Sequence, residues 1–301
     1  MSGLFPGFLT KTIRASGATI HLVTAGEGPP VLLLHGYPET HAMWHKVAPA
    51  LARKFTVVCA DLRGYGDSSK PKGLPDHSNY SKRAMAQDMV EVMAKLGHAS
   101  FHLVGHDRGG RVAHRLARDH RPIVRSITVL DISPTLKMYE STDMAFASAY
   151  YHWFFLTQPA PLPEKLLAGQ VPAYILGRLG RGRGKSGLQH FAPAARREYV
   201  RAFSNPRCIH ATCEDYRAAA SIDLLHDRHD RRRKLRMPLL ALWGRRGVIG
   251  SQFDCLADWR EVALDVTGRA LDCGHFLAEE RPEQTRRAIE GFIARHETAP
   301  R

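Results

Sequence analysis

Residues 105–109 read GHDRG and place a carboxylate side chain, Asp107, between two glycines. The preceding residues 101–104 are bulky and apolar, which is typical of a buried parallel strand. The residues from 108 to 120 have the apolar spacing of a helix. A strand, a glycine-flanked residue and a helix form a nucleophile elbow, whose tight turn holds the central side chain above a sheet. A serine is usual at this position, so the sequence predicts a carboxylate nucleophile instead of a hydroxyl.

An acid and a base follow two further apolar runs. Asp131 comes directly after residues 126–130, and His275 follows residues 262–271 through a short turn. Nucleophile, acid and histidine then stand in the chain order of an α/β-hydrolase triad. We therefore predict a triad of Asp107, Asp131 and His275, in which the acid orients the imidazole of the base.

The position of the acid has an alternative. Many sequences of this fold carry the acid one strand later, in a pattern such as W-G-x-x-D, but residues 243–248 read WGRRGV. Asp131 ends a strand beside the elbow and is the preferred candidate. Asp254 is a distant second.

A carboxylate nucleophile limits the substrates that the site can use. It can displace a leaving group from an sp³ carbon and become an alkyl ester, which water activated by His275 then attacks at the Asp107 carbonyl carbon. Alkyl halides and epoxides suit this chemistry. The turn HGYP at 35–38 follows an apolar strand. We expect the backbone N–H groups of Tyr37 and Arg108 to form an oxyanion hole, although HGYP by itself is also an ordinary tight turn.

Two arginines stand at the start of the helix after the elbow. Arg108 and Arg111 are three residues apart, so they share a helix face. An ion pair between Asp107 and Arg111 is one interpretation, but it would weaken the nucleophile and leave Arg108 unexplained. The other is a clamp for a substrate carboxylate, in the forked geometry of guanidinium groups. Without such cations, a second anion about 4 Å from Asp107 would cost ~4 kcal/mol at an effective dielectric constant of about 20.

A departing anion needs hydrogen-bond donors where its charge develops. Residues 151–153 read YHW and residues 215–217 read DYR, which supply imidazole, indole and phenol donors. An aromatic stripe of this kind is by itself more often core packing.

The elements that must position these residues follow from an alternation of apolar runs and helical patterns. Strands are expected at 30–34, 55–60, 101–104, 126–130, 238–243 and 262–271, and helices at about 41–52, 81–96, 108–120 and 282–296. The alternation predicts an α/β class of fold of the α/β-hydrolase type, a mostly parallel twisted sheet with helices on both faces. Ligands of such sheets bind at the carboxyl ends of the strands.

A helical insertion interrupts this alternation after the strand that ends before Asp131. Residues 135–235 contain no convincing strand, and aromatic residues crowd positions 150–155. We predict a core domain of residues 1–134 and 236–301 and a helical cap domain of residues 135–235 that closes the top of the site.

The composition limits which classes of protein the chain can belong to. The chain has 301 residues, 44% of them hydrophobic, and a formal net charge of +14, which allows one large core with an insertion. No apolar run is long enough to span a membrane, and the N-terminal residues do not resemble a secretory signal. Five cysteines without a C-x-x-C pair argue against disulfides or a zinc site, so we expect a cytoplasmic protein without metal or cofactor.

The basic charge is concentrated in two stretches, 178–185 and 231–234. Neither stretch has interleaved aromatic residues or a nucleic-acid motif. We therefore expect solvated loop surface, with a field that attracts small anions as a by-product, and no nucleic-acid or membrane partner.

The motifs taken together resemble the fluoroacetate (haloacetate) dehalogenases of the α/β-hydrolase fold. The matching pieces span about residues 30 to 280 and include HGYPETHAMW, CADLRGYGDSSKP, NYSKRAMAQDM, FHLVGHDRGGR, VLDISPT, YYHWFFLTQPAPLPEK, CEDYRA and CGHF. The resemblance implies hydrolysis of short 2-haloacids, such as fluoroacetate or chloroacetate, to glycolate and halide. Asp107 would be the nucleophile, His275 the base and Asp131 the acid.

The resemblance also assigns the groups that bind the substrate. Arg108 and Arg111 would hold its carboxylate, and His152, Trp153 and Tyr216 would form the halide pocket. Members of the family are commonly homodimeric, so a homodimer is expected. The stretch 177–187 is more basic and glycine-rich than expected for the family, and it could alter the entrance or the preferred chain length.

Other interpretations stay open. An epoxide hydrolase shares the aspartate nucleophile and the HG-x-P turn, and Tyr151 and Tyr216 would be its lid tyrosines, but it leaves the arginine pair unexplained. A non-catalytic ligand-binding protein, or a basic nucleic-acid-binding protein, would not need nucleophile, acid and base together. Which halide is preferred depends on pocket dimensions that residue types do not specify.

Overall fold

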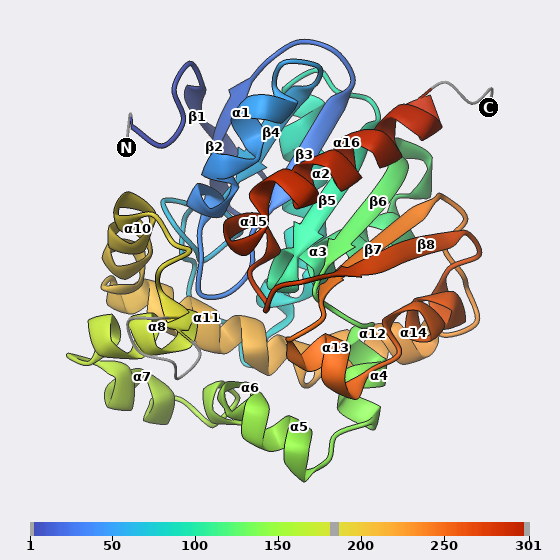
Figure 1. Ribbon diagram of the computed structural model, residues 1–301. Coiled ribbons are helices and arrows are strands. Elements are labelled where there is room, and N and C mark those ends of the chain that lie inside the picture. Colours follow the sequence, from blue (N-terminus) through green and yellow to red (C-terminus); the bar gives the residue numbers. More distant parts are fainter. Residues whose placement is uncertain (1–2, 181–186, 298–301) are drawn as a thin grey trace.

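The apolar runs of the chain pair into one sheet (Figure 1). The computed structural model describes residues 3–180 and 187–297, and within them the sheet has eight strands in the order β1-β2-β4-β3-β5-β6-β7-β8. The strands are β1 (Leu9–Arg14), β2 (Thr19–Ala25), β3 (Pro30–Leu34), β4 (Thr56–Ala60), β5 (Phe101–His106), β6 (Val124–Leu130), β7 (Leu239–Gly244) and β8 (Val266–Leu271). β1, β2 and β4 pair antiparallel, and the strands from β4 to β8 pair parallel.

The register of the central strands brings their carboxyl ends to one edge. Leu34 of β3 pairs with Ala60 of β4 and with Gly105 of β5, and Leu130 of β6 pairs with His106. Residues that directly follow these strands therefore emerge together. These strands are continuous apolar runs because both faces of the sheet are buried.

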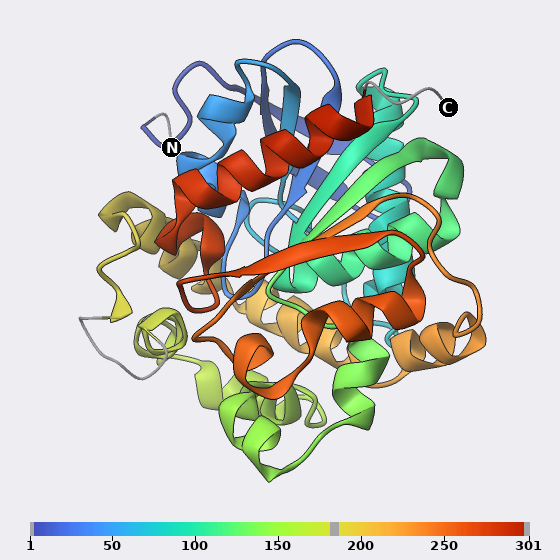
Figure 2. The ribbon, with the colours of Figure 1, turned by 45° about the vertical axis from the view of Figure 1, so that its right-hand side comes forward.

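Helices cover the two faces of the sheet (Figures 1 and 2). One face carries α1 (Ala48–Leu51) and α16 (Pro282–Glu297), with α15 (Leu277–Glu280) just before α16, and the other carries α2 (Lys82–Lys95) and α3 (Asp107–Asp119). The remaining short elements are η1 (His41–Lys46), η2 (Ser78–Tyr80), η3 (Arg121–Ile123), α13 (Val248–Gln252) and α14 (Cys255–Val262). None of the described helices is long and apolar enough to cross a bilayer.

In the described part of the chain, the segment between β6 and β7 consists of helices joined by turns and loops, with one isolated β-bridge at Leu235. It comprises α4 (Thr135–Glu140), α5 (Met144–Ala149), α6 (Tyr151–Leu156), α7 (Leu162–Leu167), α8 (Val171–Gly180), α10 (Pro193–Phe203), α11 (Pro206–Ala219) and α12 (Ile222–His229). These helices gather below the sheet in the view of Figure 1. We call residues 135–235 the inserted segment, and its separation as a cap domain stays a prediction. Residues 181–186 of the basic stretch 177–187 lie outside the described residues.

The structure differs from the expected elements at three places. The antiparallel strands β1 and β2 were not expected, because the exposed β1 has no continuous apolar run. The helix expected at 41–52 is divided into η1 and α1, since the ring of Pro49 cannot continue an α-helix past the preceding turn. The strand expected from 262 starts at Val266, because residues 255–262 complete the helical turns of α14.

Candidate active site

Asp107 is the first residue of α3 and has a positive φ of 44°. This backbone conformation is strained for a residue other than glycine and is typical of functional turns. The two flanking glycines make the turn possible. A Cβ at Gly105 would lie 2.4 Å from the Gly109 carbonyl oxygen, and one at Gly109 would lie 2.5 Å from the His35 carbonyl oxygen. The predicted close packing at both glycines is therefore present in the fold.

His275 lies between the two predicted acids. Its Nδ1 donates a hydrogen bond of 2.5 Å to Asp131 Oδ2, and its Nε2 lies 4.0 Å from Asp107 Oδ2. All three residues are buried, with at most 5% of the surface of each residue exposed. The structure thus brings the three predicted triad residues together, with the acid on one edge of the imidazole and the nucleophile facing the other.

The loop after β7 supports Asp131 and does not supply a rival acid. The Gly244 N–H donates a hydrogen bond of 2.8 Å to Asp131 Oδ1, and a Cβ at Gly247 would lie only 3.4 Å from Asp131 Oδ2. Asp254, the distant second candidate, caps α14 by accepting a hydrogen bond of 3.0 Å from the Ala257 N–H. Its carboxylate is engaged away from His275.

The turn after β3 contacts the nucleophile through its backbone. The Tyr37 N–H donates a hydrogen bond of 3.1 Å to Asp107 Oδ1. Gly36 lets the turn approach this closely, because a Cβ there would lie 2.6 Å from His106 Nδ1 and 2.7 Å from Asp107 Cβ. One oxygen of the nucleophile is therefore held by a backbone N–H, and the other faces His275.

The surrounding charges keep the nucleophile ionised. Burial by itself would raise the pKa of Asp107, but the charges on His275, Arg111, His106 and Arg108 outweigh burial and hold this pKa below its ordinary value. A carboxylate nucleophile has to be ionised to attack, so the field of the site suits that role.

Arg108 is bound to Asp215 of α11. The Arg108 Nε and Nη2 donate hydrogen bonds of 2.8 and 2.6 Å to the Asp215 carboxylate, and Nη2 also donates to the Asp215 carbonyl oxygen at 2.8 Å. Its Nη1 has no hydrogen-bond partner among the described residues. In the expected clamp, Arg108 can therefore offer a ligand only the Nη1 group of its guanidinium. No sequence pattern pointed to this pair, because 107 residues separate its members.

Asp215 has further partners that hold it in place. Lys82 forms an ion pair with Asp215 and lies 3.2 Å from Asp223 Oδ2, and the Tyr65 hydroxyl donates a hydrogen bond of 2.6 Å to Asp215 Oδ2. Burial would raise the pKa of Asp215, but the charges on Arg108 and Lys82 hold this pKa well below its usual range. The guanidinium of Arg108 is thus oriented by a permanently ionised carboxylate.

Arg111 forms no ion pair with any carboxylate of the described residues. Its Nη1 donates a hydrogen bond of 2.9 Å to Thr135 Oγ1, and its Nε has no hydrogen-bond partner among the described residues. The guanidinium carbon lies 4.7 Å from the ring centroid of Trp153. Burial lowers the pKa of Arg111, and the charge on Asp107 partly restores it. The positive charge of the buried Arg111 is therefore compensated by Asp107 at longer range and not by a direct ion pair.

An aromatic cluster from the inserted segment lies beside the two arginines. The Tyr216 ring centroid is 4.1 Å from the Arg108 guanidinium carbon, 5.8 Å from the His152 ring and 6.5 Å from the Trp153 ring. The His152 ring also stacks on Tyr37 at 5.9 Å. The structure thus assembles the three residues of the predicted halide pocket over the turn that contacts the nucleophile.

Two of these aromatic residues have free donors. Trp153 Nε1 and Tyr216 Oη are buried and have no hydrogen-bond partner in the described part of the chain. Burial and the charge on Asp107 raise the pKa of Tyr216 well above its ordinary value, so its phenol keeps its proton. Both groups can therefore donate a hydrogen bond to an anion.

Sequence reasoning missed a buried pair next to the triad. Glu39 Oε2 lies 3.2 Å from His106 Nδ1, and both side chains are fully buried. His106 Nε2 lies 2.9 Å from the His275 carbonyl oxygen. The His106 imidazole thus connects the turn after β3, the elbow and the loop that carries the base.

Tyr151, in contrast, lies at the exposed border of the cluster, with its ring 6.0 Å from that of His152. It is 48% exposed, and its ring lies 5.3 Å from the Arg178 guanidinium carbon. Tyr151 and Arg178 line a cavity of about 1000 Å³ whose other side includes Arg246 and Gly274. Gly274 directly precedes His275, so this cavity with its two arginines opens beside the loop that carries the base.

The sheet order, the elbow after β5 and the convergence of Asp107, Asp131 and His275 at the strand ends are features of α/β hydrolases. Residues 29–282 match the family model of the α/β-hydrolase fold, and the chain belongs to this family. It is 45% identical to a fluoroacetate dehalogenase from Burkholderia sp over 97% of this chain and 95% of that protein. The predicted fold class and the predicted resemblance to fluoroacetate dehalogenases are confirmed, and the protein is a hydrolase.

Other similar proteins belong to the same fold. A soluble epoxide hydrolase from Corynebacterium sp. (strain C12) is 36% identical, with 89% of this chain and 91% of that protein covered. The crystal structure of ALR0039 from Nostoc sp PCC 7120, described as an α/β hydrolase, is 57% identical. It superposes with a TM-score of 0.92 over 95% of this chain and 98% of that one.

Proposed function

We propose that this hydrolase releases halide from short 2-haloacids and converts fluoroacetate or chloroacetate into glycolate. The observation that carries the proposal is a set of buried donors that have no hydrogen-bond partner among the described residues: Arg108 Nη1, Arg111 Nε, Trp153 Nε1 and Tyr216 Oη. Leaving buried donors unpaired is costly unless a ligand pairs with them. Two cations and two neutral donors suit a ligand that has a carboxylate at one end and a developing anion at the other.

The first step forms an ester on the nucleophile. Asp107 Oδ2 attacks the carbon that bears the halogen, and the new C–O bond forms while the carbon–halogen bond breaks. The electron pair of the broken bond leaves with the halide. Arg108 and Arg111 hold the substrate carboxylate, and His152, Trp153 and Tyr216 surround the departing halide with donors.

The second step returns the free enzyme. His275 Nε2 takes a proton from a water molecule whose oxygen attacks the carbonyl carbon of the Asp107 ester. Asp131 stabilises the imidazolium through its 2.5 Å hydrogen bond to Nδ1. The Tyr37 N–H, already 3.1 Å from Asp107 Oδ1, and the Arg108 N–H bind the oxyanion. Collapse of this intermediate expels glycolate, whose new hydroxyl group takes the proton of the imidazolium, and the second water proton, left on the Asp107 carboxyl group, is released to solvent.

Ion-selective measurement of fluoride and chloride tests both steps. The wild-type protein is expected to release halide continuously from both acids. His275→Asn is expected to release at most one halide per active site and to keep an adduct on Asp107, which intact-protein mass spectrometry detects. Asp107→Asn is the matched control and should release none. Continuous release by His275→Asn would remove the assigned base.

Epoxide hydrolysis is a second candidate, favoured by the shared aspartate nucleophile and by the similarity to a soluble epoxide hydrolase. The geometry supports it less well. Tyr216 has a buried free hydroxyl, but Tyr151, the second expected lid tyrosine, is half exposed beside Arg178. Diol formation from styrene oxide without halide release from haloacetates would favour this candidate.

We also propose that the protein works as a homodimer, in the cytoplasm, on a small haloacid and water alone. Light scattering after size-exclusion chromatography should give twice the mass of one chain. Halide release should continue after treatment with a chelator, since no chemical step above uses a metal ion.

A further inference from the structure

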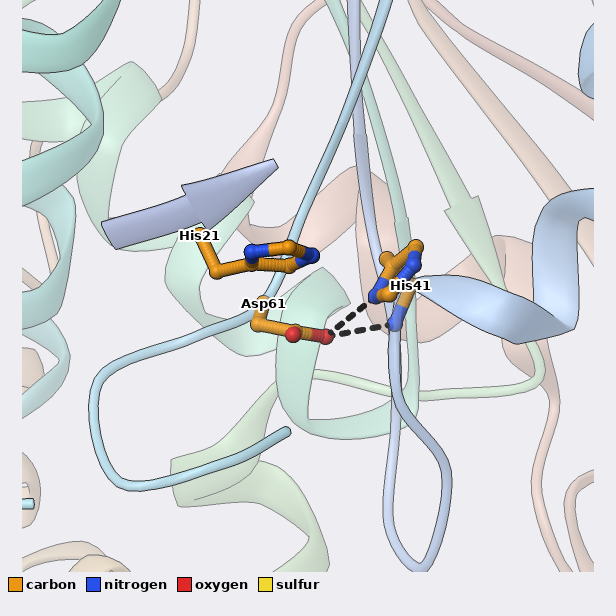
Figure 3. Close-up of side chains that lie close together, drawn as sticks. All are labelled: His21, His41 and Asp61. Carbon is orange, nitrogen blue, oxygen red and sulfur yellow. Dashed lines mark hydrogen bonds and ion pairs between the residues drawn. The ribbon is translucent and has the colours of Figure 1, made fainter. Parts of the chain in front are cut away.

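A second cluster of ionisable side chains lies outside the site, behind the turn that carries Tyr37. His21 lies in β2, His41 opens η1 and Asp61 directly follows β4 (Figure 3). One ligand atom of each residue lies within 4.8 Å of the other two. The residues are only 6%, 2% and 0% exposed.

The three side chains differ in their partners. His41 Nδ1 lies 2.9 Å from Asp61 Oδ1, and the His41 backbone N–H donates to the same oxygen at 2.8 Å. His21 Nε2, in contrast, is buried and has no hydrogen-bond partner among the described residues. Figure 3 shows the His21 ring pointing toward the space between His41 and Asp61. A buried imidazole nitrogen without a partner is costly, so its orientation into this cluster indicates a ligand.

The surroundings of the cluster favour a cation. Asp67 and Glu198 lie close enough to act electrostatically on His21, in addition to Asp61. Arg201 forms ion pairs of 2.9 and 2.7 Å with Asp67 and Glu198. His35 Nε2 also lies 4.0 Å from Asp61 Oδ1. Around the cluster, three carboxylates are thus accompanied by one arginine and three histidines, so negative charge remains to be neutralised whenever the histidines are neutral.

We propose that His21, His41 and Asp61 bind one divalent transition-metal ion, with Zn²⁺ the best fit. Two imidazole nitrogens and one carboxylate oxygen are preferred ligands of Zn²⁺, at distances of about 2.0–2.2 Å, and the same donors bind Co²⁺ and Ni²⁺. Two ligand atoms about 2.0 Å from a metal and at the tetrahedral angle to each other are about 3.3 Å apart. The 2.9 Å between His41 Nδ1 and Asp61 Oδ1 must therefore lengthen by about 0.4 Å to admit the ion.

Binding requires small changes in the cluster. The metal ion takes the place of the proton between His41 Nδ1 and Asp61 Oδ1, and this proton is released to solvent. The His21 ring moves toward the pair to bring Nε2 within bonding distance, and a water molecule completes the tetrahedral set. The ligands come from β2, η1 and the loop after β4, so the ion would connect three separate segments.

The role inferred for this ion is structural. The turn at 35–38 lies between β3 and η1, and η1 begins with the ligand His41. A metal ion at the cluster would therefore restrain the segment that carries Tyr37 while contacting neither Asp107 nor His275. The inference does not depend on which substrate the active site takes.

Binding is tested with Co²⁺ and Zn²⁺ on the full chain after dialysis against a chelator. We expect one equivalent of Co²⁺ to give visible d–d absorption and one equivalent of Zn²⁺ to displace it. Zn²⁺ at about a hundredfold excess over its Kd should raise the Tm by about 5 °C. His21→Phe should weaken binding at least about a hundredfold and should fold normally, because Nε2 has no partner to lose.

The controls separate this site from adventitious binding by other histidines. His229→Ala removes an exposed histidine of α12 and should bind both ions as the wild type does. His21→Gln, which keeps a polar side chain, replaces His21→Phe if the latter has a lower Tm without metal. Equal binding by the wild type and both His21 variants would overturn the proposal. So would the absence of saturable Co²⁺ binding by the wild type.

Discussion

Arg108 and Asp215 form a buried two-pronged ion pair that joins the nucleophile elbow to α11 of the inserted segment. Tyr216 follows Asp215 directly, and its ring lies 4.1 Å from the same guanidinium. One contact therefore positions a proposed carboxylate-binding group and a proposed halide-binding group. It also leaves a single guanidinium nitrogen, Nη1, for the ligand.

Loss of the Asp215 charge should impair both catalysis and folding. In Asp215→Asn the buried Arg108 loses its carboxylate and Lys82 keeps only that of Asp223, so the free energy of unfolding should fall by about 3–5 kcal/mol. The kcat/KM for chloroacetate should fall at least about a hundredfold, because Arg108 is no longer oriented. Urea unfolding and halide-release kinetics measure the two effects.

The matched control for this variant is Glu261→Gln. It removes an exposed ion pair of 2.8 Å with Lys137 and should change stability by no more than about 1 kcal/mol. An Asp215→Asn protein with wild-type kcat/KM would show that the ion pair does not position the substrate.

The free donors of Tyr216 and Trp153 should matter more for fluoride than for chloride. Fluoride is the stronger hydrogen-bond acceptor, and the carbon–fluorine bond is harder to break. Tyr216→Phe and Trp153→Phe should each lower kcat for fluoroacetate by about 10²–10³-fold, as the loss of one donor to a developing charge does. The loss for chloroacetate should be smaller.

Tyr80→Phe is the control for these variants. It removes a phenol that donates to the Pro71 carbonyl oxygen at 2.6 Å, away from the site, and should leave kcat unchanged for both acids. Equal losses on fluoroacetate and chloroacetate in the site variants would contradict a role in binding the halide.

Glu39 should make stability fall as the pH rises. Burial raises the pKa of Glu39 from the ordinary value of 4.5 to about 7, although the hydrogen bond with His106 acts in the opposite direction. Between these pH values the folded protein keeps a proton that the unfolded chain has released, so the free energy of unfolding decreases with pH. A shift of this size corresponds to about 3 kcal/mol across the window.

Glu39→Gln should remove this contribution. Urea unfolding at intervals from pH 5 to pH 8 should show the wild type losing stability relative to the variant as the pH rises. The raised pKa of His106 acts with the same sign, because that stabilisation is also lost as the pH rises through the folded pKa. Parallel stability curves for the two proteins would show that the Glu39 carboxyl group is ionised throughout.

A single methyl group at Gly109 should disrupt the elbow. A Cβ there would lie 2.5 Å from the carbonyl oxygens of both His35 and Leu34, and these backbone atoms cannot move without disturbing β3. Gly109→Ala should therefore lower the free energy of unfolding by about 1–3 kcal/mol or more and displace the nucleophile.

Gly177→Ala is the control for that substitution. No heavy atom of residues 3–180 or 187–297 lies within 4 Å of the added Cβ, and the residue is in α8. Its stability should rise by up to about 1 kcal/mol because alanine favours helix. Thermal unfolding compares the two variants, and a Gly109→Ala protein as stable as the wild type would show that the elbow can relax.

Much of the fold could be predicted because its signals are local. Continuous apolar runs predicted β3 to β7 within a few residues, and the helix after Asp107 begins where the glycines allow the turn. β1 could not be found this way, since it is mostly exposed and its sequence, LTKTIR, contains no apolar run. The division between η1 and α1 is caused by Pro49, and the helical spacing of apolar residues did not predict this division.

The sequence by itself determined which residues follow each strand, and so predicted that Asp107, Asp131 and His275 meet at one edge of the sheet. The positions of the strands along the chain and the chemistry of the side chains that follow them can be recognised in short stretches of sequence. Only the tertiary structure decided that Asp215 binds two nitrogens of the Arg108 guanidinium, and that His21 points at His41 and Asp61. Such contacts join residues far apart in the chain, and their distances are set by the packing of whole elements rather than by any local pattern.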